Sequence, residues 1–375
     1  MIRYHVPYWT SSIMSEVSDQ LSVNPFQSHE QLAKSTTEQF KDHFGYGEIG
    51  YQYFLSSATA ALEVMALALE IGAGDEVIMP SFTHVSTANA FARRGAVLKF
   101  ADIEMETLNL DPASVERQLS QRTKAIVPIH YGGIPVDLEA FQAIADIGRC
   151  VVLEDASHGI GANYNGKALG LHGEMGCLSF HQTKNLTAGG SGGCLFLNSP
   201  ELNQRVETII SHGTNRMAFL RGEIPKYEWC SLGSEYEMPL YQLLFLNRAV
   251  AKMEWITKRR VKLWNLYLNS LRSLTEKGLS FSSRSSENGH IFYLLLPGGV
   301  DRKAFMGSLL EEGIETSTHY TPLHTTAMGI QYGRGPNRLY NTETVSERIV
   351  RLPLHHLLTE GELEHVVSKI IDYFK

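Results

Sequence analysis

The sequence predicts an α/β protein with a mostly parallel central sheet and a smaller C-terminal α+β domain. Strand-like and helix-like stretches alternate over residues 51–154, as in repeated βαβ units. A long helical pattern then separates this part from a shorter mixed region, and 375 residues suffice for one large and one smaller domain. We therefore expect an N-terminal arm and large domain over 1–240, a connecting long helix over 241–274 and a small domain over 275–375.

The first half of the chain supplies most of the expected sheet. The opening to about residue 27 is irregular and aromatic, and Ser28 with Gln31 then forms a capping-box signature for a helix that ends near residue 44. The repeating pattern that follows has strands at 51–55, 76–79, 96–101, 124–129 and 150–154, and helices at 59–71, 84–93, 112–120 and 137–147. Asp111–Pro112 gives the third of these helices its N-cap and first-turn proline.

The second half begins with a hairpin turn at Asn165–Gly166, followed by strands at Cys177–His181 and Gly193–Leu197. Residues 212–238 mix arginines, aromatics and glycines without a clear period, which indicates a binding loop. A helical pattern runs from 240 to about 274. The small domain then has strands at 290–296 and 314–320, helices at 302–312 and 343–350, and a last helix that begins at Thr359 with another capping box.

Composition excludes several classes of protein. With 33 Lys+Arg against 40 Asp+Glu, the net charge of −7 gives no electrostatic footprint for nucleic acid. No apolar run approaches the length of a membrane span, and the first nine residues lack the apolar core of a signal peptide. The four cysteines lack metal-ligand spacing, so we interpret them as reduced core residues and expect no metal site. We expect a cytoplasmic protein.

One lysine lies in a crowded turn. Lys184 follows Ser179–Thr183, and the glycine-rich stretch 189–193 comes soon after it. A lysine amine forms a Schiff base with a carbonyl only if burial and neighbouring groups lower its pKa enough to leave free amine. A lone lysine is more often a solvated surface residue, so this stretch needs further support.

Asp155 supplies that support. It ends the apolar run 150–153, and ligands of open α/β sheets bind beyond the carboxyl ends of strands. An aspartate for the pyridinium nitrogen and a Schiff-base lysine are the pairing that pyridoxal 5′-phosphate (PLP) requires. Ser57, Ala58 and Thr59 begin a helix and form a ready site for a phosphate, although ordinary capping explains the same residues.

Several motifs, in order along nearly the whole chain, resemble the DegT/DnrJ/StrS family of sugar aminotransferases. They are Ser57-Ala58-Thr59, Gly74 to Ser81, Glu154-Asp155-Ala156, Ser179 to Gly193, His319 to His324 and Arg351 to Leu354. The resemblance implies a PLP-dependent enzyme of fold type I, the aspartate-aminotransferase-like fold. Within the family, Pro80 to Ala90, Ser179 to Gly193 and His212 to Arg216 are most similar to the dTDP-4-amino-4,6-dideoxygalactose transaminases.

The resemblance also implies roles for individual residues. Lys184 would form the Schiff base and move a proton, and Asp155 would keep the pyridine nitrogen protonated. The other expected cofactor contacts are His158 at the phenolic oxygen, His84 stacked on the ring, and Ser57, Ala58, Thr59 and Ser179 at the phosphate. A buried structural histidine is the alternative for His158.

Substrate residues follow from polar and aromatic groups in loops expected opposite the cofactor. They are Asn215, Arg216, His319, Tyr320 and His324, with loop packing as the alternative for each. Arg216 suits a carboxylate or diphosphate because its planar fork makes paired contacts. Two features depart from the family: Glu235 stands where an asparagine from the neighbouring subunit usually contacts the phosphate, and residues 22–27 replace a glycine-containing segment.

The leading hypothesis is amino transfer from L-glutamate to the 4-keto carbon of dTDP-4-keto-6-deoxyglucose, a nucleotide-linked ketosugar. The product would be a dTDP-4-amino-4,6-dideoxyhexose for cell-surface polysaccharide synthesis. Alternatives are a 3-aminotransferase or UDP-ketosugar aminotransferase of the same family, a PLP-dependent sugar dehydratase, in which histidine replaces the lysine, and a non-catalytic regulator. The resemblance further implies a homodimer with shared active sites.

Overall fold

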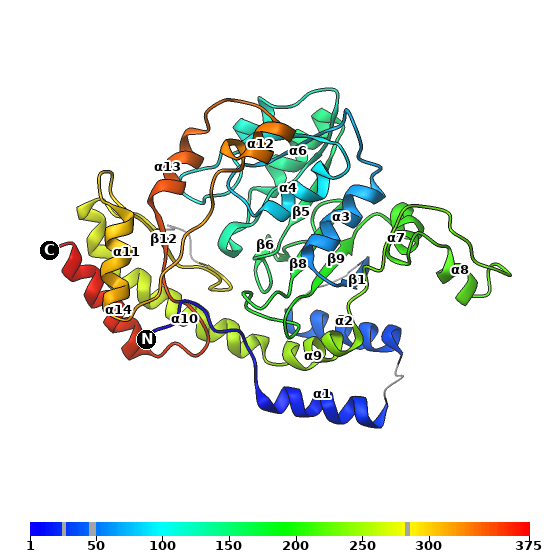
Figure 1. Cartoon of the computed structure of the whole chain (residues 1–375), viewed down its shortest axis with the longest axis horizontal. Coiled ribbons are helices and arrows are strands. Elements are labelled where there is room, and N and C mark those ends of the chain that lie inside the picture. Colours follow the sequence, from blue (N-terminus) through cyan, green and yellow to red (C-terminus); the bar gives the residue numbers. More distant parts are fainter. Residues whose placement is uncertain (25–27, 45–49, 282–285) are drawn as a thin grey trace.

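Short apolar stretches separated by helices pair into one sheet in the computed structural model, which describes residues 1–24, 28–44, 50–281 and 286–375. Within these residues, eight strands follow the order β1-β9-β8-β5-β4-β2-β3-β11. Figure 1 labels β1, β9, β8 and β5 of this sheet near the centre of the molecule. Neighbours are parallel except that β9 runs opposite to β1 and β8. The bounds are β1 Tyr51–Leu55, β2 Glu76–Pro80, β3 Val97–Ala101, β4 Thr123–Ile126, β5 Val151–Asp155, β8 Met175–Ser179, β9 Gly193–Leu197 and β11 Gly333–Arg334. The predicted mostly parallel sheet is confirmed.

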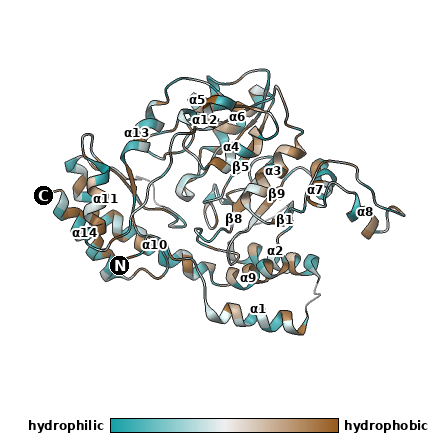
Figure 2. Ribbon diagram, in the orientation of Figure 1, coloured by the Kyte–Doolittle hydropathy of each residue, from teal (hydrophilic) through white to brown (hydrophobic). Residues whose placement is uncertain are grey.

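Helices cover both faces of this sheet because successive strand side chains point to opposite sides. In β5, Val152 packs in the core beneath α2, α6 and α9, whereas Leu153 packs in the core beneath α3, α4 and α7. The helix α3 is mostly hydrophobic along its length (Figure 2). The helices of this part are α1 Ser11–Val23, α2 His29–Phe44, α3 Ala58–Ala68, α4 Val85–Ala92, α5 Pro112–Glu116, α6 Leu138–Gly148, α7 Asn203–Ile210, α8 Arg216–Leu220 and α9 Leu240–Val250, with 3₁₀ turns η1 Tyr131–Gly133 and η2 Pro200–Leu202.

A third core forms around a small antiparallel sheet near the C-terminus. Its strands β10 (Tyr293–Leu295) and β12 (Ile349–Arg351) pack with surrounding helices around Trp264, Phe292 and Phe305. The last helix begins with the predicted capping box of Thr359 and Glu362. The remaining elements are α10 Met253–Leu271, η3 Arg272–Lys277, α11 Arg302–Glu311, η4 Leu323–Thr325, α12 Ala327–Tyr332, α13 Tyr340–Arg348 and α14 Glu360–Tyr373. The division at residues 240 and 274 stays a prediction.

Two local predictions from turn and capping chemistry are confirmed. Ser28 Oγ accepts a hydrogen bond from Gln31 N at the start of α2. Asn165 and Gly166 both have positive φ, 49° and 77°, as a tight hairpin between β6 (Asn163–Tyr164) and β7 (Lys167–Ala168) requires.

The irregular opening segment was wrongly predicted, because residues 11–23 form helix α1. Thr10 caps it by accepting a hydrogen bond from Ile13 N, and Ile13 and Val17 are buried one turn apart. Their spacing gives a narrow apolar stripe that packs on α9. Residues 25–27 of the segment predicted to reshape the sugar-nucleotide edge lie outside the described residues.

The prediction of a single long helix over 241–274 was also wrong. This stretch is divided at Ala251–Lys252 into α9, which packs on α1 and α2, and α10, which packs on α14. Neither glycine nor proline marks this break, and the two parts pack against different helices. Residues 314–320 form only isolated bridges, Ile2 to Ile314 and Ser317 to Arg351, rather than a strand. The helix predicted at 343–350 ends at Arg348 and gives way to β12.

All four cysteines are free, as predicted, but they are not all core residues. Cys177 and Cys194 are buried in the sheet, Cys150 is half-buried, and Cys230 is exposed in the 212–238 segment. No helix in the described part of the chain is long and apolar enough to cross a membrane.

Candidate active site

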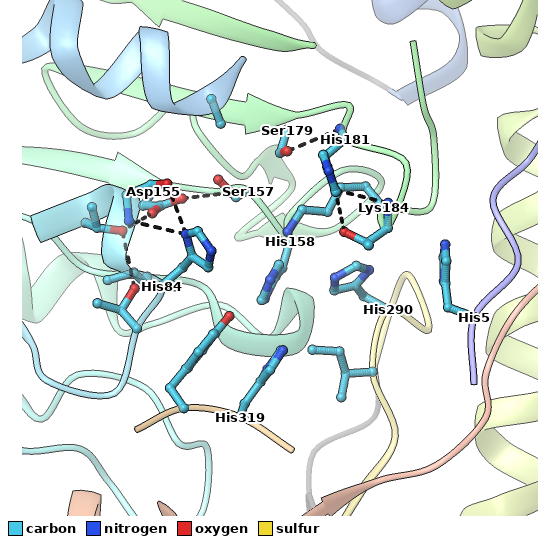
Figure 3. A pocket seen from close by; sticks show the side chains of 18 of the residues that line it. His5, His84, Asp155, Ser157, His158, Ser179, His181, Lys184, His290 and His319 are labelled. Carbon is cyan, nitrogen blue, oxygen red and sulfur yellow. Dashed lines mark hydrogen bonds between the residues drawn. The ribbon is translucent and has the colours of Figure 1, made fainter. Parts of the chain in front are cut away.

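A cavity of about 480 Å³ opens at the carboxyl ends of the parallel strands (Figure 3). Asp155 is the last residue of β5 and Ser179 the last of β8, so both strands end at this cavity. The volume lies within the roughly 300–1,000 Å³ typical of small-molecule sites. Of the residues predicted from the sequence, the cavity is lined by Ser57, Ala58, Thr59, His84, Asp155, His158, Ser179, Lys184, His319 and Tyr320.

Lys184 lies in the loop between the antiparallel strands β8 and β9. The loop folds back on itself through hydrogen bonds such as Phe180 N to Gly192 O, 2.8 Å, and Lys184 N to His181 O, 2.8 Å. Burial lowers the pKa of Lys184 to about 8; the Asp155 carboxylate opposes this shift, and the Arg351 guanidinium adds to it. The structure therefore gives this amine the free base that a carbonyl-directed nucleophile needs.

Hydrogen bonds hold both oxygens of the Asp155 carboxylate in the cavity. Asp155 is 5% exposed. One oxygen accepts a hydrogen bond from Thr87 Oγ1 at 2.8 Å, and the other accepts from Ser157 N at 3.1 Å. Thr87 lies on α4 and Ser157 lies in the turn after β5, so a helix and a turn together orient this carboxylate.

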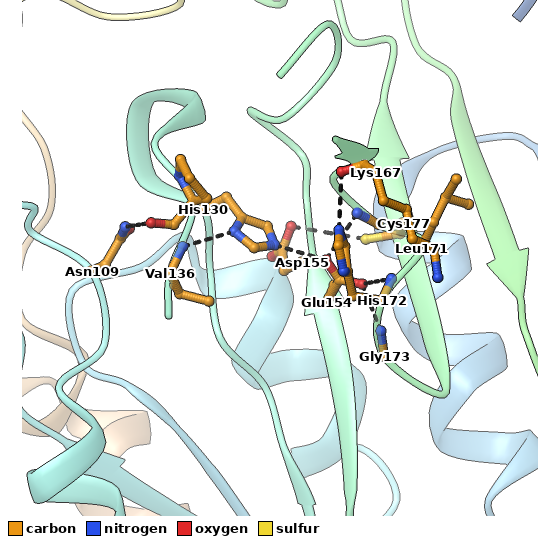
Figure 4. Close-up of polar contacts among 12 residues, drawn as sticks. Asn109, His130, Val136, Glu154, Asp155, Lys167, Leu171, His172, Gly173 and Cys177 are labelled. Atoms are coloured by element: carbon orange, nitrogen blue, oxygen red, sulfur yellow. Dashed lines mark hydrogen bonds and ion pairs between the residues drawn. The ribbon is translucent and has the colours of Figure 1, made fainter. Parts of the chain in front are cut away.

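The neighbouring Glu154 anchors the strand end that carries Asp155 (Figure 4). Its buried carboxylate accepts backbone hydrogen bonds from Gly170, His172 and Gly173, and one from His130 Nε2 at 3.0 Å. Burial raises the pKa of Glu154, but these hydrogen bonds outweigh burial and hold the pKa below its usual value. Because side chains alternate along a strand, Glu154 fastens β5 from the side opposite Asp155.

The first turn of α3 forms one wall. Ser57 is its N-cap, and Ser57 Oγ accepts from Ala60 N at 3.0 Å. The turn carries no acidic side chain, and the helix dipole favours an anion there. Gly193 allows β9 to reach this turn, because an added Cβ would lie 2.2 Å from the carbonyl carbon of Ser57.

Histidines line the cavity in uncharged form. His158 Nδ1 accepts from Gly132 N at 3.3 Å, which assigns its proton to Nε2, and its ring lies 4.5 Å from that of His290. Burial lowers the pKa of both rings well below the usual value, and positive Lys184 adds to the shift. His84 caps α4 through Nδ1 and is exposed to the cavity. These rings offer hydrogen bonds and stacking surfaces without charge.

His319 and Tyr320 enter from the C-terminal part of the chain. Their rings stack 4.0 Å apart, and His319 Nδ1 contacts Tyr131 Oη at 3.1 Å. Sequence reasoning missed their neighbours in the lining, including Tyr4, His5, Thr87 and Arg351. Arg351 begins one of the motifs that resemble the family. An isolated cation directly before apolar Leu352 is the feature of the sequence that could have indicated a role for it in the site.

Three predicted substrate residues do not line the cavity in this chain. His324 Nδ1 lies 2.7 Å from Ser81 Oγ, and His324 Nε2 contacts Glu343. These contacts give His324 a structural role. Arg216 is exposed on α8, which lies at the far end of the molecule from β5 and β8 in Figure 1. The Asn215 side chain accepts a hydrogen bond from Glu228 N. The segment 212–238 folds against itself through bridges such as Thr214 to Trp229, which carries these residues away from the site.

We expect the Lys184 amine to titrate near pH 8 in the protein without cofactor, whereas an ordinary lysine titrates near 10.5. Since the pKa of this base is lowered, the neutral amine predominates above pH 8 and falls about tenfold for each pH unit below it. NMR titration of ¹³C-lysine-labelled protein measures this, with Lys184→Arg to assign the signal and exposed Lys167→Arg as control. A Lys184 signal that titrates near 10.5 would contradict the expected desolvation.

Comparison with known structures places the fold among aminotransferases. An aminotransferase TlmJ from Streptoalloteichus hindustanus is 27% identical, with a TM-score of 0.88 over 99% of this chain and 98% of the other. An aminotransferase from Psychrobacter cryohalolentis is 26% identical, with the same TM-score and coverage. Helicobacter pylori PseC, an aminotransferase involved in the biosynthesis of pseudoaminic acid, is 22% identical, with a TM-score of 0.86 over 100% and 99% of the two chains, and shows likeness of fold alone.

The family-level comparison goes further than these structures. The model of the DegT/DnrJ/EryC1/StrS aminotransferase family matches residues 13–371, which is nearly the whole chain and includes the strands that end at the cavity. The protein with this lysine, this aspartate and this sheet belongs to the DegT/DnrJ/EryC1/StrS aminotransferase family.

Proposed function

We propose that this protein transfers an amino group from L-glutamate to the 4-keto carbon of dTDP-4-keto-6-deoxyglucose, giving a dTDP-4-amino-4,6-dideoxyhexose for cell-surface polysaccharide synthesis. Membership of the aminotransferase family makes it a PLP enzyme of fold type I. The observation that carries the proposed chemistry is the shared cavity of Lys184 and Asp155. The choice of sugar rests on the resemblance to the dTDP-4-amino-4,6-dideoxygalactose transaminases, which is carried by Pro80–Ala90, Ser179–Gly193 and His212–Arg216.

The residues present fit PLP. The first turn of α3 with Ser57, Ala58, Thr59 and the Ser179 hydroxyl offers donors for the phosphate. We assign Asp155 to the ring nitrogen, His158 Nε2–H to the phenolic oxygen and His84 to one ring face. When bound, the cofactor supplies an electron sink at the donor's α-carbon.

The chain's own groups then move the proton and orient the charge beside the ring. Lys184 Nζ, whose neutral form predominates above about pH 8, can take the proton from the donor's α-carbon and return it during transfer to the sugar. Asp155 keeps its charge oriented because Thr87 Oγ1 and Ser157 N hold both carboxylate oxygens. Lys184 also disfavours the PLP-dependent sugar dehydratase, in which the resemblance places histidine at this position.

Substrate identity is tested by incubating purified protein with glutamate and separate nucleotide-ketosugars. We expect one aminated product from dTDP-4-keto-6-deoxyglucose by mass spectrometry, with NMR locating the amine at C4. The 3-keto and UDP-linked sugars are the comparison substrates. Faster amination of either one, or dehydration in place of amination, would replace the proposed reaction with that alternative.

Replacing Asp155 with Asn should lower kcat by on the order of 10²-fold or more, because the neutral amide no longer stabilises charge that develops in the ring. PLP affinity should change far less, since the phosphate contacts remain. Turnover and cofactor binding are measured on the same preparation. Asp111→Asn, at the N-cap of α5, is the matched control because it changes the same groups outside the cavity. An unchanged kcat in Asp155→Asn would remove Asp155 from the ring site.

We also propose a homodimer with shared active sites, since segment 212–238 exposes large apolar side chains, with Leu220 57% and Trp229 75% exposed. Exposed apolar clusters of this kind mark interaction surfaces. Light scattering should give twice the 41.9 kDa chain mass, and Trp229→Glu should shift the protein toward the single-chain mass. Tyr340→Glu, an exposed aromatic of α13 outside that segment, should not. An active wild-type monomer would rule out shared sites.

A further inference from the structure

Arg351 brings a positive charge into the cavity without a carboxylate to match it. Its Nη1 donates to His319 Nε2, and its guanidinium lies over the Tyr4 ring, 4.9 Å from the centroid. Its Nε is buried and has no hydrogen-bond partner. Across the described parts of the chain, no acidic side chain forms an ion pair with it.

The rest of the cavity leaves this charge unbalanced. Asp155 is the one carboxylate among the described residues that line the cavity, and its two oxygens already accept hydrogen bonds from Thr87 and Ser157. The lining histidines add no negative charge. A guanidinium stays protonated at any ordinary pH, and a partly buried charge without a partner is costly. Retaining it in a pocket therefore indicates a ligand that carries the missing negative charge.

The cofactor phosphate has other partners, because the first turn of α3 and Ser179 lie on the large-domain side of the cavity. Arg351 comes from β12 on the opposite side, beside His319 and Tyr320. Its charge also acts on the Lys184 amine, at which amino transfer is centred. These positions leave the substrate as the source of the anion.

We propose that Arg351 binds the oxyanion of a substrate in this cavity, either the carboxylate of the amino donor or the diphosphate of the sugar nucleotide, with Tyr4 and His319 holding the guanidinium plane. The inference rests on the proposed function for its two ligands. It transfers to Arg351 the role that the sequence suggested for Arg216. A fork with a free Nε–H and a second nitrogen suits the paired oxygens of either group.

The two halves of the reaction separate the ligands. Glutamate alone converts the cofactor, and the ketosugar alone converts it back, each followed by the cofactor's absorbance. In Arg351→Gln, the substrate concentration for half-maximal rate should rise roughly tenfold or more in one half-reaction only, with a smaller fall in the limiting rate. Arg351→Lys should recover part of the loss, because it keeps the charge without the fork. Arg3→Gln, exposed beside Tyr4, is the control.

Binding without turnover tests the site independently of the proposed function. Calorimetry of the cofactor-free protein with glutarate, and separately with dTDP, should show weaker binding of one probe to both Arg351 variants. A defect confined to glutamate and glutarate identifies the carboxylate, and one confined to ketosugar and dTDP identifies the diphosphate. If both probes bind the correctly folded Arg351→Lys protein as they bind wild type, and neither half-reaction changes, the inference is wrong. If no ketosugar is aminated but a probe still requires Arg351, only the proposed function fails.

Discussion

The antiparallel course of β9 is the constraint on which the site depends. Since β9 returns beside β8, the loop between Ser179 and Gly193 begins and ends at one edge of the sheet, and Lys184 is held over the carboxyl ends of the parallel strands. The contact of Gly193 with the first turn of α3 joins this loop to that wall of the cavity. If β9 had continued the parallel order, a crossover helix would have to join it to β8, and the two ends of the loop would lie at opposite ends of the sheet.

The parts of the site that the sequence predicted well are those encoded locally. Asp155 ends a short apolar run, and Ser57 stands where a strand gives way to a helix, so each position follows from its own neighbours. The alternation of strands and helices along the chain as far as β5 is also a local pattern, whereas the order of the strands in the sheet is not. Even Lys184 could be singled out, because the glycines after it require a tight return.

What the sequence could not predict depends on distant segments. The position of Arg351 in the cavity depends on its contacts with Tyr4 and His319, and no pattern in the sequence links these three distant residues. The break between α9 and α10 has no glycine or proline to mark it in the sequence, and it shows only in the different helices on which the two parts pack. Arg216 shows the reverse error: its chemistry suits an oxyanion, but backbone pairing within its own segment carries it away.

The pairing of the first residues with the last part of the chain also bears on how the protein folds. Tyr4 N donates to Glu315, 311 positions away, and Leu354 N donates to Tyr4 O. Contacts of such long range can form only when both segments of the chain are present, and closing a longer loop costs somewhat more entropy than closing a short one. During synthesis the large sheet can therefore assemble first, while the wall that contains Tyr4 and Arg351 must wait for nearly the whole chain to emerge. This wall of the cavity can therefore be completed only after the strands that carry Asp155 and Ser179 have been synthesised.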